Sequence, residues 1–191
     1  MGATLLAACS TVGERTSLSV GYYTIGGETF EDIDQQIALH GPAVLGVGRA
    51  LAATTVRMSP DFRFGFDGGA CRVTHARVSV NAHVTLPKLT SQQRLRQELS
   101  RAWESLEQYA RLHESVHVAI ADTHALRAER AILALPPEPS CDRLRGSASL
   151  MFRQMMVEHE REQLQFDEDE KGRIAAMVNR TRAIDRGTAT Q

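Results

Sequence analysis

The stretch that most constrains the fold of this chain runs from Ser91 to Leu135 and contains neither Gly nor Pro. Within it, apolar side chains and histidines recur every three or four residues, which is the period of one face of an α-helix. The members of this face are Leu95, Leu99, Ala102, Leu106, Ala110, His113, His117, Ile120 and His124. We therefore predict one long helix that carries histidines on its buried face.

Three residues of this helix, His113, Glu114 and His117, form the pattern HExxH. Helical residues four positions apart share a face, with Cβ atoms about 5–6 Å from each other, so both imidazoles can reach one metal ion. Glu114 then lies beside the ion, where its carboxylate can take a proton from a metal-activated water, as in zinc metalloproteases. The alternative is a pair of core histidines satisfied by hydrogen bonds. The glutamate between two histidines at this spacing favours a metal site, with Zn²⁺ as the cofactor.

A second helix is predicted from about Asp142 to Glu170, after a Pro-rich break. The short turn makes the two helices antiparallel neighbours, and counting outward from its centre brings His159 and Glu160 level with His117. Catalytic zinc normally takes three protein ligands. We predict His159 as the third ligand because it also lies on the apolar face of its helix, while Glu160 and Asp167 remain alternatives.

The region before the long helix has the pattern of β-strands. Leu18–Ile25 has strand composition, and Thr29 can cap a short helix that follows it. From Ala52 to Leu86 apolar side chains alternate with polar ones, with turns expected at Pro60-Asp61 and at Asp67–Gly69. The elements together predict an α+β fold, in which a small antiparallel sheet packs on the long helix and on a second, antiparallel helix.

The first residues, MGATLLAACS, resemble the lipobox of bacterial lipoproteins, although they lack the usual basic segment. This pattern predicts that Cys9 is lipidated and residues 1–8 are removed, with the true start upstream. An ordinary apolar N-terminus is the alternative. Export would leave Cys71 and Cys141 as one pair in an oxidising compartment, which predicts a disulfide between them in preference to two buried thiols.

Charge and hydropathy limit the partners of the protein. The net charge of −1 with dispersed signs argues against nucleic acid, and no stretch reaches the roughly 18 apolar residues of a membrane span. We therefore expect membrane contact only through an N-terminal lipid anchor. Residues 1–16 are predicted to be a signal remnant and tether, 17–172 one domain, and 173–191 a disordered basic tail. No pattern indicates an oligomeric state.

Beyond these patterns, the order of motifs in this chain resembles the bacterial domain of unknown function family 922, described as predicted secreted zinc-dependent proteases. The motifs that carry the resemblance are the YYTI strand, a strand containing Thr, Cys71, the strand from Val78 to Pro87, Trp103, the HExxH motif, Cys141 and the pair Phe166-Asp167. The resemblance covers about Tyr22 to Gly172. It implies zinc on His113 and His117, with Glu114 catalytic.

The chain departs from the family pattern at its end. The family pattern continues after its Tyr-Asp pair to a Thr and a His-Gly, whereas this chain reads FDEDEKG from Phe166 to Gly172. The histidine is absent. If that histidine is a metal ligand in the family, this protein uses another group or binds zinc more weakly.

Motif and resemblance together predict a zincin-like, zinc-dependent metallopeptidase of the bacterial cell envelope, periplasmic or attached to the outer membrane. Its partner would be a peptide or protein substrate, with Tyr109 and His83 as possible donors to the oxyanion. The alternative is a non-catalytic envelope lipoprotein or binding module with a vestigial metal site. The sequence does not identify the substrate.

Overall fold

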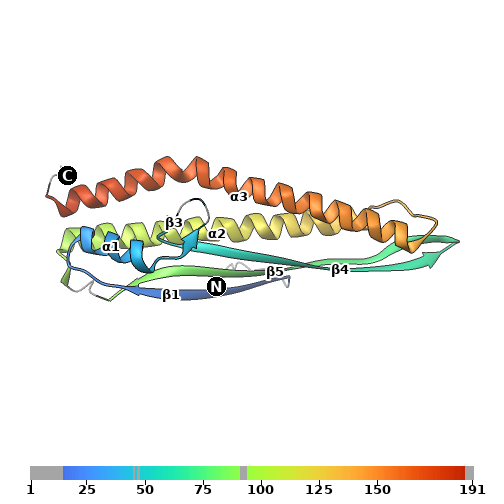
Figure 1. Cartoon of the computed structure of the whole chain (residues 1–191), viewed down its shortest axis with the longest axis horizontal. Helices are drawn as coiled ribbons and strands as arrows, with labels where there is room; N and C mark the ends of the chain where they lie inside the picture. Colours follow the sequence, from blue (N-terminus) through green and yellow to red (C-terminus); the bar gives the residue numbers. More distant parts are fainter. Residues whose placement is uncertain (1–14, 45, 47, 91–93, 188–191) are drawn as a thin grey trace, which may run out of the picture.

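The computed structural model describes residues 15–44, 46, 48–90 and 94–187. They form an elongated body in which a sheet, one long helix and a second long helix lie in successive layers (Figure 1). In chain order the elements are β1 (Thr16–Ile25), α1 (Phe30–His40), β2 (Ala43–Val44), β3 (Gly48–Arg49), β4 (Ala53–Asp67), β5 (Ala70–Leu89), α2 (Gln97–Leu133) and α3 (Cys141–Asp185). The mixed α+β class predicted from the sequence is confirmed.

The main sheet has the strand order β1-β5-β4. β4 and β5 form a long antiparallel hairpin, closed at Gly68 and Gly69, which both adopt positive φ angles that a tight turn requires. β1, however, pairs with β5 in parallel. The sheet is therefore mixed, and the prediction of a purely antiparallel sheet is wrong. The turn predicted at Pro60-Asp61 is also wrong, because β4 is an edge strand and an edge tolerates proline.

One face of β5 packs directly on α2. Its alternating residues Val78, Val80, Ala82, Val84 and Leu86 are buried, as their period predicts. Opposite them, α2 presents Ala121, Ala125 and Ala128, which are fully buried. Small side chains at these positions let the helix backbone approach the sheet closely. The other face of α2 is thereby left to contact α3.

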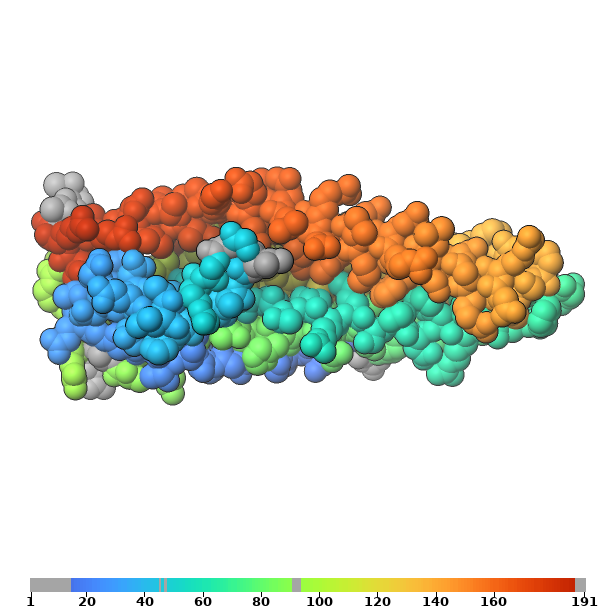
Figure 2. All heavy atoms as spheres, in the orientation of Figure 1, coloured from blue at the N-terminus to red at the C-terminus, as the bar shows by residue number. Residues whose placement is uncertain are grey.

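α3 forms one long edge of the molecule over its whole length (Figure 2). It continues to Asp185, so the prediction of a disordered tail from residue 173 is wrong for that part. The last turns are held by tertiary contacts, because Met177 and Val178 pack on the core cluster around Trp103 and the Asp185 carboxylate accepts a hydrogen bond from the Phe30 amide. None of the described helices is both long enough and apolar enough to span a membrane.

A disulfide joins Cys71, at the start of β5, to Cys141, the first residue of α3. The predicted bridge is confirmed. Beside it, Cys71 and Glu138 exchange two backbone hydrogen bonds, which fasten the hairpin to the turn between the helices. The predicted lipidation site, Cys9, lies outside the described residues.

Loss of this disulfide should destabilise the protein. The bridge closes a loop with a sequence separation of 70 residues, and the chain-entropy model gives about 4 kcal/mol for a loop of that length. Urea unfolding of Cys71→Ser/Cys141→Ser should show a free energy of unfolding that is lower by that order. Equal stabilities of the variant and wild type would contradict the expectation.

Candidate metal centre

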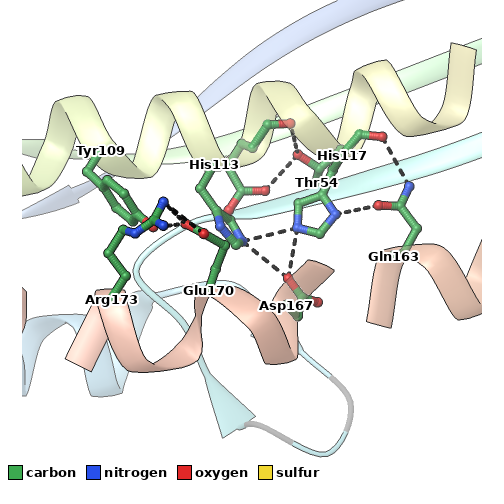
Figure 3. Close-up of polar contacts among 9 residues, drawn as sticks. Thr54, Tyr109, His113, His117, Gln163, Asp167, Glu170 and Arg173 are labelled. Atoms are coloured by element: carbon green, nitrogen blue, oxygen red, sulfur yellow. Dashed lines mark hydrogen bonds and ion pairs between the residues drawn. The ribbon is translucent and has the colours of Figure 1, made fainter. Parts of the chain in front are cut away.

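The two histidines of the HExxH motif meet a carboxylate from α3 (Figure 3). The Asp167 Oδ1 atom lies 3.2 Å from His113 Nε2 and 3.0 Å from His117 Nε2, and the two Nε2 atoms are 3.1 Å apart. Histidines four residues apart on one helical face and an aspartate from the facing helix thus converge on a single point. In the described part of the chain, this is the one group of three such residues that could hold a metal ion.

The centre is enclosed by α2 and open on the side of α3. The side chains of His113 and His117 are 10% and 12% exposed, whereas that of Asp167 is 50% exposed. Phe166 packs on both imidazoles, stacked on His113 at a centroid distance of 4.7 Å and edge-on to His117 at 5.1 Å. The aromatic ring restricts how the two imidazoles can turn, while solvent or a substrate can still approach from the aspartate side.

Glu114 lies beside this group and is not part of it. The residue is 5% exposed, and its Oε2 atom accepts a hydrogen bond of 2.7 Å from the Thr54 hydroxyl on β4. Burial raises the pKa of the Glu114 carboxyl, while the Thr54 hydrogen bond and the two neighbouring imidazoles act to lower it. The Thr54 hydrogen bond holds Oε2 and so orients the carboxylate.

His159, which the sequence predicted as the third ligand, does not meet His113 and His117 in the structure. Its Nε2 atom lies 2.8 Å from the Gln163 side-chain nitrogen, and its ring packs edge-on to His124. Glu160, the alternative to His159, is exposed.

The residue of α3 that lies level with His117 is Gln163, one helical turn after His159. Its side-chain amide donates a hydrogen bond to the His117 carbonyl. Counting outward from the centre of the turn therefore placed α3 about one helical turn away from its observed position. Asp167 is the residue of α3 that meets His113 and His117.

The other polar residues considered from the sequence have separate partners. His124 is buried and contacts Glu162 at 2.8 Å, which fits a core histidine. His83 lies on the face of β5 opposite α2 and contacts Ser19, so it does not reach the centre. Tyr109, one turn before His113, donates its hydroxyl proton to Glu170.

Thr54 and Gln163 are the polar partners that the sequence patterns did not single out. Thr54 occupies an ordinary position in an alternating strand, and Gln163 lies within a polar run of α3. Only the packing of β4 and α3 against α2 gives either residue a role. Asp167, in contrast, could have been found from the sequence, because it belongs to the Phe166-Asp167 pair that is part of the family resemblance.

The three converging atoms fit a divalent cation. A neutral imidazole nitrogen without a proton and a carboxylate oxygen both accept hydrogen bonds. The three atoms lie 3.0–3.2 Å apart, so a proton or a cation must lie between them to offset their repulsion. Ligands about 2.0–2.2 Å from a common tetrahedral zinc lie roughly 3.3 Å apart. The observed separations are close to this value. Two imidazoles and one carboxylate are also a ligand set used by catalytic zinc.

A family model described as "Bacterial protein of unknown function (DUF922)" matches residues 20–173. No curated protein and no solved structure matches the chain. The matched range contains the converging group of α2 and α3 as well as Thr54.

Proposed function

The chain belongs to the DUF922 family of bacterial proteins, and we propose that it is a zinc-dependent metallopeptidase of the cell envelope. The observation that carries this proposal is the convergence of His113, His117 and Asp167, with Glu114 held beside them by Thr54. The packing of the HExxH helix between a sheet and a second helix that carries Asp167 supports the zincin-like part of this proposal.

In this proposal His113 and His117 hold zinc through Nε2, and Asp167 holds it through Oδ1. Zinc, when bound, supplies a Lewis acid that polarises a carbonyl and makes water a better nucleophile at neutral pH. The Glu114 carboxylate takes the proton of the attacking water at Oε1 and passes it to the leaving amine. Thr54 keeps that carboxylate oriented through both proton transfers.

The substrate class follows from the openness of the centre. The Asp167 side chain is 50% exposed, so the centre reaches solvent on that side. An extended segment of a peptide or protein can approach along that side, so the protein should not require a small, enclosed ligand.

The test is metal-dependent hydrolysis. The full chain, loaded with one equivalent of zinc, is incubated with an unfolded protein and the fragments are identified by mass spectrometry. We expect cleavage that a zinc chelator abolishes and added zinc restores. Zinc binding without any cleavage would contradict the enzyme and favour the alternative, a non-catalytic envelope protein with a vestigial site.

The envelope location rests on the disulfide, since such bonds persist in oxidising compartments. Lipidation at Cys9 would explain attachment to a membrane. When wild type and Cys9→Ser are expressed in bacteria behind a signal sequence and the cells are fractionated, only the variant should be found in the soluble fraction. Equal partitioning of the two proteins would contradict lipid attachment.

A further inference from the structure

The side chain of Gln163 lies between two histidines, and its contacts determine which ring nitrogen of His117 carries a proton (Figure 3). Its Oε1 atom is 2.5 Å from His117 Nδ1. Its Nε2 atom donates to the His117 backbone carbonyl at 3.0 Å and lies 2.8 Å from His159 Nε2. One carboxamide therefore contacts both the ring and the backbone of a proposed ligand.

The chemistry of these contacts leaves one consistent arrangement of protons. A backbone carbonyl only accepts hydrogen bonds, so the Gln163 atom that faces it must be the NH₂ group. The carboxamide oxygen then faces His117 Nδ1 and can only accept, so Nδ1 must carry the proton. A carboxamide turned the other way would bring two acceptors together at the carbonyl. The lone pair of the neutral His117 ring is consequently on Nε2, which points to His113 and Asp167.

His159 supports the same arrangement from the far side. The second hydrogen of the Gln163 NH₂ group points to His159 Nε2, which accepts it when the His159 ring is neutral. Burial lowers the pKa of His159, and the nearby His124 lowers it further, so the neutral ring is favoured. His159 thus holds the carboxamide in the orientation that His117 requires.

The two proposed ligands are held in different ways. His113 Nδ1 is buried and has no hydrogen-bond partner among the described residues, while the His113 ring is stacked on Phe166. His117, in contrast, has a hydrogen bond on its Nδ1 atom. Hydrogen bonds to the outer nitrogen of a ligating histidine orient the ring and raise its basicity. Of the two histidines, only His117 has such a hydrogen bond among the described residues.

We propose that Gln163 is a positioning residue, which holds His117 in its Nδ1–H form and so presents Nε2 to the metal, and that His159 acts through Gln163. This inference rests on the proposed function, because presenting Nε2 matters only if His117 binds a metal. The proton arrangement itself exists without metal, so it can be tested apart from any activity.

The first test is nitrogen NMR of the histidine rings in the metal-free full chain, at a pH where the imidazoles are neutral. Wild type should show His117 as the Nδ1–H form. Gln163→Leu should lose this preference because it removes the oxygen that accepts from Nδ1. Gln165→Leu is the matched control, since the Gln165 amide bonds Asp169 on the exposed face of α3. The same His117 form in wild type and in Gln163→Leu would overturn the inference.

The second test is zinc affinity, measured by competition with a chelating indicator. Gln163→Leu should weaken binding by about 10–100-fold, the usual cost of losing such a partner. Gln165→Leu should bind zinc as wild type does. Unfolding curves of the metal-free variants establish that each one folds. If wild type binds zinc and Gln163→Leu binds it equally well, the inference fails and the proposed function stands. If wild type binds no zinc, the proposed function fails, and the NMR result alone decides the proton arrangement.

Discussion

Glu114→Gln should bind zinc as wild type does and lose about 100-fold or more of the hydrolytic rate, the contribution of a general base. The substitution keeps the shape of the side chain, and a glutamine oxygen can still accept the hydrogen bond from Thr54. It removes only the capacity to take a proton. Rates on an unfolded protein substrate and zinc content of the same preparation are the two measurements.

Glu107→Gln is the matched control for this variant. Glu107 lies on the same helix and pairs with Arg111 at the surface, so its substitution should change neither rate nor zinc content. A wild-type rate in Glu114→Gln would show that the water is activated without this carboxylate. Loss of zinc from the variant would show instead that Glu114 serves metal binding.

Removal of a ligand should have a different effect. His113→Ala, His117→Ala and Asp167→Ala should each weaken zinc binding by more than the 10–100-fold typical of an outer hydrogen-bond partner. His159→Ala should fall within that smaller range, because His159 reaches the centre only through Gln163. Competition titrations of the four variants give the comparison.

Glu168→Ala is the control for the aspartate, since Glu168 is the next residue and pairs only with Lys171 at the surface among the described contacts. The result to compare is the order of zinc affinities among the variants. If His159→Ala lost as much affinity as His117→Ala while Asp167→Ala lost none, the ligand assignment would return to the one expected from the sequence.

The sequence predicted those features that depend on local periodicity. The recurrence of apolar residues placed His113 and His117 on one helical face, and strict alternation identified the buried face of β5. Thr29 was expected to cap α1, and in the structure it forms a capping box with Asp32. Each of these features is decided by neighbours within a few residues along the chain.

The features that the sequence did not predict depend on contacts between distant segments. The register of α3 against α2 is set by side-chain packing along both helices, so Asp167 and not His159 reaches the two histidines. The parallel pairing of β1 with β5 leaves no local pattern, since strand residues alternate in the same way in either direction. The end of α3 is ordered by its contacts with α1 and with the core around Trp103, which lie far from it in the sequence.

The structure also shows which side chains meet near the position where this chain departs from the family pattern. The histidine expected after the aromatic–Asp pair is absent, yet the aspartate of that pair, Asp167, completes a three-residue group with His113 and His117. The three side chains therefore converge in this chain without that histidine.

The metal content of the purified full chain tests the central claim most directly. After incubation with excess zinc and removal of unbound ions, elemental analysis should find one zinc per wild-type chain and markedly less in His117→Ala. Wild-type protein that is folded, takes up no zinc and gives no change on zinc titration would contradict the account.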